Sequence, residues 1–112
     1  MVAGSRYWPN YARVYVQQAV LALPPHVLLT GGARGVDQWA EAYDAQATWV
    51  VTFLPRYLHE QDRVAPLQRN TVLVEQADHV FCFWNGKSRG TQDVIWKARQ
   101  AKKLRHVFYL SQ

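Results

Sequence analysis

The stretch Leu28–Trp39, with the sequence LLTGGARGVDQW, constrains the fold more than any other part of the chain. Residues 26–29 are short, apolar and β-prone, which predicts a buried strand. Gly31 and Gly32 follow immediately and permit backbone angles that are closed to other residues. The apolar residues after them recur at helical spacing and predict a helix to about Ala47. We therefore expect a strand, a glycine turn and a helix in direct succession.

Such a turn points free backbone N–H groups and the positive end of a helix dipole at one place, which suits an anion such as a phosphate. The pattern Gly31-Gly32-x-x-Gly35 is shorter than the dinucleotide fingerprint G-x-G-x-x-G, and no carboxylate stands at the end of the next strand. No Gly-Lys-Ser/Thr follows, so it is not a Walker A motif. The alternative interpretation is a tight turn that needs glycine only for close packing of strand and helix.

The rest of the chain alternates predicted strands with predicted helices. The strands are expected over residues 1–3, 26–29, 49–54, 78–84 and 105–110, and the other helices over 9–23, 66–76 and 91–102. The run 49–54 is apolar and β-branched, so it is expected to be buried on both faces. Five strands alternating with four helices predict an α/β fold: a single Rossmann-like, three-layer domain over residues 1–112, with a mostly parallel five-stranded sheet.

The composition agrees with one globular domain. Apolar residues make up 49% of the 112 positions and charged residues 19%. The absence of a membrane-length apolar run and of a signal-peptide pattern predicts a cytoplasmic protein. The single cysteine, Cys82, lies in a strand-like run and is expected to be a core residue. The four histidines share no metal-ligand spacing, so we expect no metal site and no required cofactor.

The net charge of +5 raises the possibility of a nucleic-acid partner. The basic residues are scattered, however, and many lie in or beside predicted turns where acids are sparse. This placement suits an anionic small ligand as well as a polynucleotide. The basic residues in question are Arg6, Arg34, Arg56, Arg69, Lys87 and Arg89.

In parallel sheets, ligands bind beyond the carboxyl ends of the strands, where the strand order reverses. The turns predicted at those ends are residues 4–6, 30–35, 55–63 and 84–91, and all four carry glycine, hydroxyl, basic or aromatic residues. The expected ligand-binding residues are Gly4, Ser5, Arg6, Gly31, Gly32, Arg34, Gly35, Asp37, Arg69, Asn70, Trp84, Ser88, Gly90 and Thr91.

These residues suggest separate roles. The glycines and Thr91 would donate hydrogen bonds to a phosphate, and Ser5 and the arginines would add a hydroxyl donor and positive charge. Asp37 or Asn70 would bind a ribose hydroxyl, and Trp84 would stack on a base. The alternatives are ordinary turns, exposed arginines, an Asp37 that serves only the helix dipole, and a Trp84 that belongs to the core.

The order of these motifs resembles the SLOG superfamily, which includes the Smf/DprA and LOG proteins. The matching segments are GlySerArg, ThrGlyGlyAlaArgGlyValAsp, ArgAsn, AlaAsp before an apolar strand, and GlyLysSerArgGlyThr. The likeness covers nearly the whole chain and is greatest to the small-protein YspA/YpsA-related DUF2493 group. It implies a Rossmann-like domain whose glycine turns bind a nucleotide or nucleotide-derived ligand. It also agrees with a homodimer, which an aromatic content of 13% in so small a domain suggests independently.

The resemblance also bears on catalysis. LOG enzymes cleave the N-glycosidic bond of nucleoside 5′-monophosphates with an arginine and a glutamate. Arg69 matches the arginine, but the glutamate position falls on Val94, one residue past Asp93. Without that carboxylate, an oxocarbenium-like transition state loses its stabiliser.

Three functions follow as hypotheses. The first is a domain that senses or sequesters a nucleoside monophosphate or an ADP-ribose-like or NAD-derived molecule. The second is an N-glycosidase that uses Arg69 with Asp93 or Asp37 as the acid. The third is binding of single-stranded DNA, as in DprA; it is ranked last because the basic residues form no extended stripe.

Overall fold

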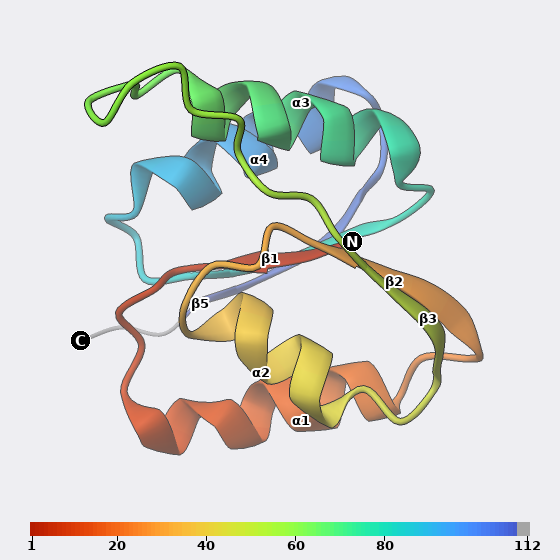
Figure 1. Ribbon diagram of the computed structural model, residues 1–112. Helices are drawn as coiled ribbons and strands as arrows, with labels where there is room; N and C mark the ends of the chain where they lie inside the picture. Colours follow the sequence, from red (N-terminus) through yellow and green to blue (C-terminus); the bar gives the residue numbers. More distant parts are fainter. Residues whose placement is uncertain (110–112) are drawn as a thin grey trace.

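The computed structural model describes residues 1–109, which form three layers with the strands in the middle (Figure 1). One face of the strands is covered by helices α1 (Arg13–Leu21) and α2 (Val36–Tyr43), and the other by α3 (Ala65–Gln76) and α4 (Arg89–Gln100). A short 3₁₀ turn, η1 (Asn10–Ala12), leads into α1. No helix in this part of the chain has the length and apolar character needed to cross a membrane.

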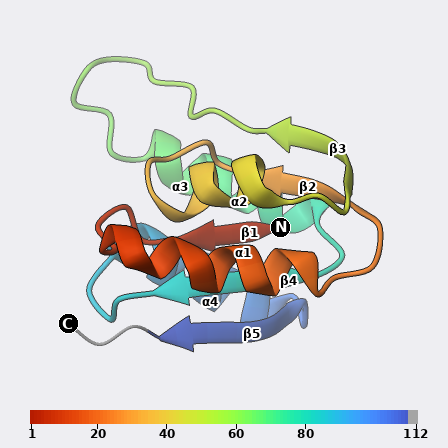
Figure 2. The ribbon, with the colours of Figure 1, turned by 90° about the horizontal axis from the view of Figure 1, so that it is seen from below.

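All paired strands run parallel. Strand β4 lies between β1 and β5, and β2 pairs with β3, so the hydrogen-bonded ladder consists of a three-stranded and a two-stranded part. Strand β2 lies beside β1, which gives the spatial order β3-β2-β1-β4-β5 (Figure 2). The predicted α/β class and the alternation of strands and helices are confirmed. The strands are β1 (Val2–Gly4), β2 (His26–Thr30), β3 (Ala47–Thr52), β4 (Val80–Trp84) and β5 (Leu104–Tyr109).

The strand order reverses at β1. The chain places β2 and then β3 on one side of β1, and crosses back through α3 to place β4 on the other side (Figure 2). The connections that leave the carboxyl ends of β1 and β4 therefore diverge to opposite sides of the sheet. This divergence opens a crevice at the rim, the usual place for a ligand in an α/β fold.

Two apolar clusters, one on each face of the strands, form the core. Alternate residues of a strand point to opposite faces, and accordingly Ala3 joins the cluster under α3 and α4 while Val2 joins the cluster over α1 and α2. In β4, Cys82 and Phe83 divide in the same way. The prediction that Cys82 is a core residue is confirmed, and burial raises the pKa of its thiol to about 12.

Strand β3 contradicts the prediction that the run 49–54 is buried on both faces. Trp49 is 73% exposed, and Val50 and Val51 are exposed as well. The physical reason is position: β3 is the edge strand of the two-stranded part, and the helices pack over the strands nearer the centre (Figure 1). An apolar β-branched run identifies a strand but does not say whether it lies at the centre or at the edge of a sheet.

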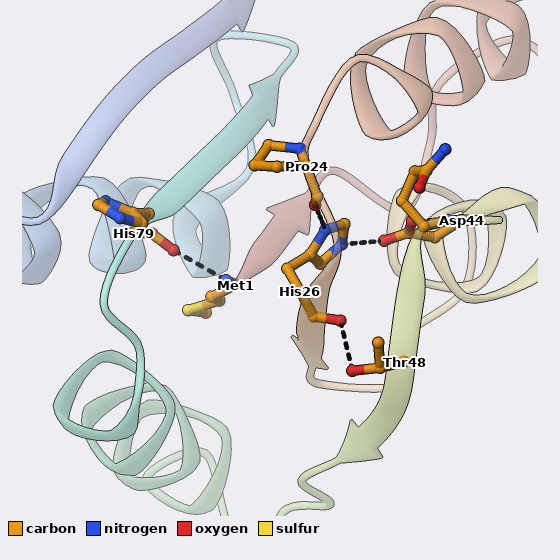
Figure 3. A network of polar contacts seen from close by, with 7 residues as sticks. Met1, Pro24, His26, Asp44, Thr48 and His79 are labelled. Atoms are coloured by element: carbon orange, nitrogen blue, oxygen red, sulfur yellow. Dashed lines mark hydrogen bonds and ion pairs between the residues drawn. The ribbon is translucent and has the colours of Figure 1, made fainter.

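Several element boundaries differ from the prediction. Helix α2 ends at Tyr43 instead of about Ala47, because Asp44 leaves the helical conformation. The Asp44 carboxylate meets the His26 ring at 2.5 Å, and the Thr48 hydroxyl donates to the His26 carbonyl oxygen at 3.1 Å (Figure 3). At the amino end of the strands, the first contact joins the end of α2 to the start of β2, and the second joins β3 to it. Leu110, the predicted end of the last strand, lies outside the described residues.

Strand β1 touches helix α2 at one point that only glycine allows. A Cβ atom at Gly4 would lie 2.5 Å from the Cβ of Val36, a separation that packed side chains do not reach. Val36 is itself fully buried, at the first turn of α2. The approach of backbone to helix brings the start of α2 against the carboxyl end of β1.

We expect Gly4→Ala to lower the free energy of unfolding by about 1–3 kcal/mol, because the added methyl group forces β1 and α2 apart. Gly90→Ala is the matched control and should not lower stability, since apart from its chain neighbours and its own helix backbone nothing lies within 4 Å of the place where its Cβ would be. Urea denaturation followed by circular dichroism measures both. Equal stability of Gly4→Ala and the wild type would contradict this account of the contact.

Candidate functional site

A cavity of about 510 Å³ opens at the carboxyl ends of β1 and β4, in the crevice that the reversal of strand order creates. The end of β1, the turn that follows it, the turn before α2, the start of α3 and the loop before α4 all contribute to it. Its lining residues are Ala3, Gly4, Arg6, Tyr7, Ala33, Asp37, Pro66, Arg69, Asn70, Asn85, Lys87, Ser88, Gly90, Thr91 and Val94.

The glycine turn folds as its residues predict, but the N–H groups of Gly31, Gly32 and Ala33 are already used. The backbone N–H groups of Gly31 and Ala33 both donate to Oδ2 of Asp37 at 3.2 Å. The N–H group of Gly32 donates to the Thr30 hydroxyl at 3.3 Å. The carboxylate of Asp37 thus stands where an anionic ligand was expected, so the N–H groups of Gly31 and Gly32 are not free phosphate donors.

Each glycine of this turn is needed for a different physical reason. Gly32 and Gly35 have φ of 68° and 76°, the left-handed region that favours glycine. Gly31 does not, but a Cβ there would lie 2.6 Å from Nη1 of Arg69. At Gly35 a Cβ would lie 2.7 Å from the carbonyl oxygen of Arg6, so the turn packs tightly against the end of β1.

Asp37 is 5% exposed and lines the cavity. Burial raises the pKa of its carboxyl to about 6, although the N–H groups of Ala33, Gly31 and Gly4 and the charge of Arg69 act in the opposite direction. Its Oδ2 accepts the two turn hydrogen bonds, whereas Oδ1 has no hydrogen-bond partner among the described residues. A buried carboxylate oxygen without a donor is unusual in a folded protein.

Arg69 joins α3 to the ends of the neighbouring strands. Its Nη1 donates to the carbonyl oxygen of Gly31 at 2.7 Å and to that of Phe53 at 3.3 Å, and its Nε donates to Oδ1 of Asn70 at 3.0 Å. Burial lowers the pKa of its guanidinium, and the like charge of Arg6 acts in the same direction, while Asp37 opposes both. Arg69 therefore lines the cavity as a side chain fixed in place by backbone carbonyl groups.

Asn70 continues this network into α4. Its Nδ2 donates to the carbonyl oxygen of Gly90 at 3.3 Å and to Oδ2 of Asp93 at 3.2 Å, and the Asp93 carboxylate forms an ion pair with Lys97 at 2.8 Å. Asp93 does not line the cavity, whereas Val94 does. The carboxylate that borders the cavity is thus Asp37, from the opposite layer of the fold.

The loop between β4 and α4 presents the start of that helix to the cavity. The Asn85 side chain accepts from the N–H groups of Lys87 at 2.9 Å and Ser88 at 3.0 Å, and the Ser88 hydroxyl caps α4 by accepting from the N–H of Thr91 at 3.4 Å. Ser5 is fully buried, and its hydroxyl accepts from the N–H of Asn85 at 3.1 Å. Ser5 therefore positions the loop and does not reach the cavity.

Of the predicted ligand-binding residues, the structure gathers eight around the cavity: Gly4, Arg6, Asp37, Arg69, Asn70, Ser88, Gly90 and Thr91. The others lie outside its lining: Ser5, Gly31, Gly32, Arg34, Gly35 and Trp84.

Trp84, which was expected to stack on a base, packs against the core instead. Its indole N–H donates to the carbonyl oxygen of Ser88 at 2.9 Å, and its ring lies 5.8 Å from that of Tyr109. Tyr7 and Lys87 are among the seven lining residues that were not predicted as site residues, and Tyr7 is 79% exposed. Their position in strand-end turns could have identified them from the sequence. Tyr7 follows Arg6 directly, and Lys87 lies inside the loop 86–90.

The architecture defines a Rossmann-like α/β protein with a rim cavity. No protein-family profile matches the chain, and no curated protein matches it in sequence. Among solved structures, DNA processing protein A (DprA) from Helicobacter pylori, described for its single-stranded DNA binding mode, matches 99% of this chain with a TM-score of 0.73 and 19% sequence identity. The chain spans 65% of the length of that structure. At this identity the likeness establishes the fold alone.

We expect stability to fall by about 3 kcal/mol as pH rises from about 4 to 6, through the action of Asp37. Its pKa is raised in the folded state from 3.8 to about 6, so the folded protein binds the proton more tightly than the unfolded chain does. This stabilisation is complete below pH 4 and lost above pH 6. In Asp37→Asn the amide oxygen can accept the same two N–H groups, so the variant should lack this fall.

Urea denaturation of both proteins at pH 4, 5, 6 and 7 measures the difference. Asp78→Asn removes an exposed carboxylate at the amino end of β4 and serves as the control for charge. Identical pH profiles for the wild type and Asp37→Asn would contradict the account.

Proposed function

We propose that this chain binds a phosphorylated nucleotide or nucleotide-derived ligand in the cavity at the strand-order reversal, and acts as a sensing or sequestering domain. A nucleoside monophosphate and an ADP-ribose-like or NAD-derived molecule are the ligand classes in question. The observation that carries the proposal is the meeting of Arg6, Lys87 and the start of α4 at this one cavity.

The start of α4 is suited to hold the anionic part of the ligand. The positive end of a twelve-residue helix dipole faces the cavity there, and Gly90 has no side chain to bar a ligand from the backbone. The hydroxyl groups of Ser88 and Thr91 lie 3.2 Å apart beside it. With Arg6 and Lys87, these groups provide charge and donors for a phosphate.

The size and the remaining lining of the cavity support a nucleotide over a bare phosphate ion. A volume of about 510 Å³ falls in the range of small-molecule sites. The exposed ring of Tyr7 borders it and takes the stacking role first expected of Trp84. Pro66 and Val94 add apolar surface for a base.

Membership of the SLOG superfamily is part of this proposal, and the DprA-like fold supports it. The placement in the YspA/YpsA-related DUF2493 group, the cytoplasmic location and the homodimer stay predictions. Sedimentation velocity of the purified protein tests the dimer.

We expect at least one of the four ribonucleoside 5′-monophosphates or ADP-ribose to bind in isothermal titration calorimetry. Arg6→Ala and Lys87→Ala should each weaken that binding about tenfold, because each removes a charge-assisted hydrogen bond to phosphate. Arg99→Ala, which removes an exposed charge from the last turn of α4, is the control and should bind as the wild type does. Absence of binding for all five compounds would refute the proposal.

Single-stranded DNA binding is the second candidate, favoured by the DprA neighbour and the net charge of +5. It requires an affinity for an oligothymidylate that falls steeply with salt, since phosphate contacts release counterions. Fluorescence anisotropy between about 50 and 300 mM salt, a range that includes physiological ionic strength, measures this slope. If the nucleotide proposal holds, a bound mononucleotide should compete with any such binding.

Hydrolysis of a nucleotide is the remaining hypothesis. Asp93 is engaged by Asn70 and Lys97 outside the cavity, so Asp37 is the carboxylate available to a bound sugar. Incubation with the same monophosphates and chromatography for free base distinguishes turnover from binding.

A further inference from the structure

Among the described residues, one oxygen of the Asp37 carboxylate has no hydrogen-bond donor. Its Oδ2 accepts two backbone N–H groups. The N–H of Gly4 also acts on the carboxylate, but no donor among the described residues reaches hydrogen-bond geometry at Oδ1. Asp37 is 5% exposed and lines the cavity. A buried acceptor without a donor costs free energy, and a carboxylate oxygen costs more than a neutral one. A ligand that brings a donor to Oδ1 recovers that cost.

The neighbouring side chains place their donors elsewhere. Arg69, whose charge acts on Asp37, directs Nη1 to the carbonyl oxygens of Gly31 and Phe53 and Nε to Asn70. The amide nitrogen of Asn70 donates to Gly90 and Asp93. These hydrogen bonds direct the three donor atoms away from Oδ1, so a ligand that enters the cavity can supply the missing donor.

Asp37 also restricts how a ligand lies. A phosphate beside this carboxylate would be repelled, whereas Arg6, Lys87 and the start of α4 attract it from other parts of the lining. A suitable ligand therefore carries an anionic group at one point and a neutral hydrogen-bond donor at another. A ribose 5′-phosphate unit has this arrangement, because its 2′- and 3′-hydroxyl groups lie on the sugar away from the phosphate.

On the basis of the nucleotide-binding function proposed above, we propose that Oδ1 of Asp37 accepts a hydrogen bond from a sugar hydroxyl and thereby selects monomeric ribonucleotides. A residue within a DNA strand has no 2′-hydroxyl, and its 3′-oxygen is esterified, so its sugar offers no such donor. Asp37 is thus the specificity-determining residue that separates a free ribonucleotide from a DNA strand.

The test compares the four ribonucleoside 5′-monophosphates with their 2′,3′-dideoxy counterparts by isothermal titration calorimetry at pH 7.5. For each ribonucleotide that binds the wild type, the dideoxy compound should bind about 10- to 100-fold more weakly, as expected for a lost hydrogen bond to a charged acceptor. The 2′-deoxy and 3′-deoxy compounds then identify which hydroxyl makes the contact.

The protein variants complete a thermodynamic cycle. In Asp37→Asn the difference between ribo and dideoxy compounds should shrink to about twofold, while Asp78→Asn, with the same charge change at the other end of the strands, should keep the full difference. The comparison of ligands in the wild type stands even if Asp37→Asn fails to fold.

Each outcome has one meaning. Equal binding of ribo and dideoxy compounds by the wild type overturns the role of Asp37 and leaves the proposed function intact. If Asp37→Asn still binds the ribo compounds more tightly than the dideoxy compounds by the full difference, the role of Asp37 is overturned and the proposed function is likewise left intact. Absence of binding by all four ribonucleotides overturns the selection proposal together with nucleoside-monophosphate binding.

Discussion

The site depends on the hydrogen bonds that the Asp37 carboxylate accepts from the N–H groups of Gly31 and Ala33. They draw the first turn of α2 against the end of β2 and fix the glycine turn between them. They also fill, with a side chain of the protein itself, the place where a strand–turn–helix unit of this kind would hold an anion. The positive end of α4 is thereby left as the point of the rim best suited to a phosphate.

The cavity wall is held by contacts that cross between the layers of the fold. Arg69 reaches from α3 to the carbonyl oxygen of Gly31, and Gly31 lacks the Cβ that would block it. Gly35 packs equally closely on the carbonyl oxygen of Arg6. Because these contacts are made by backbone groups and one fixed guanidinium, a ligand would meet a wall that is already ordered. Preorganisation of this kind limits the entropy lost on binding.

The sequence was sufficient to predict the elements and the rim, because both follow from local patterns. Apolar patterns, together with the prolines and glycines that bound them, located the helices and strands, and the turns after β1 and β4 converge as parallel topology requires. It could not predict that strand β3 is exposed, since an edge strand and a central strand share the same β-branched composition. Nor could it predict that Asp37 binds the glycine turn, or decide whether Trp84 stacks on a ligand or packs against the core, because both depend on distances across the fold.

The most direct test of the central claim, that one rim cavity at the strand-order reversal binds a nucleotide, is an amide NMR titration with a ribonucleoside monophosphate. The account predicts that the shifted signals are those of residues at the cavity, Arg6, Ala33, Gly90 and Thr91 among them. The signals of His26 and Asp44, at the opposite end of the strands, should stay in place (Figure 3). Shifts centred on that opposite end, or no shifts with any of the four nucleotides, would contradict the account.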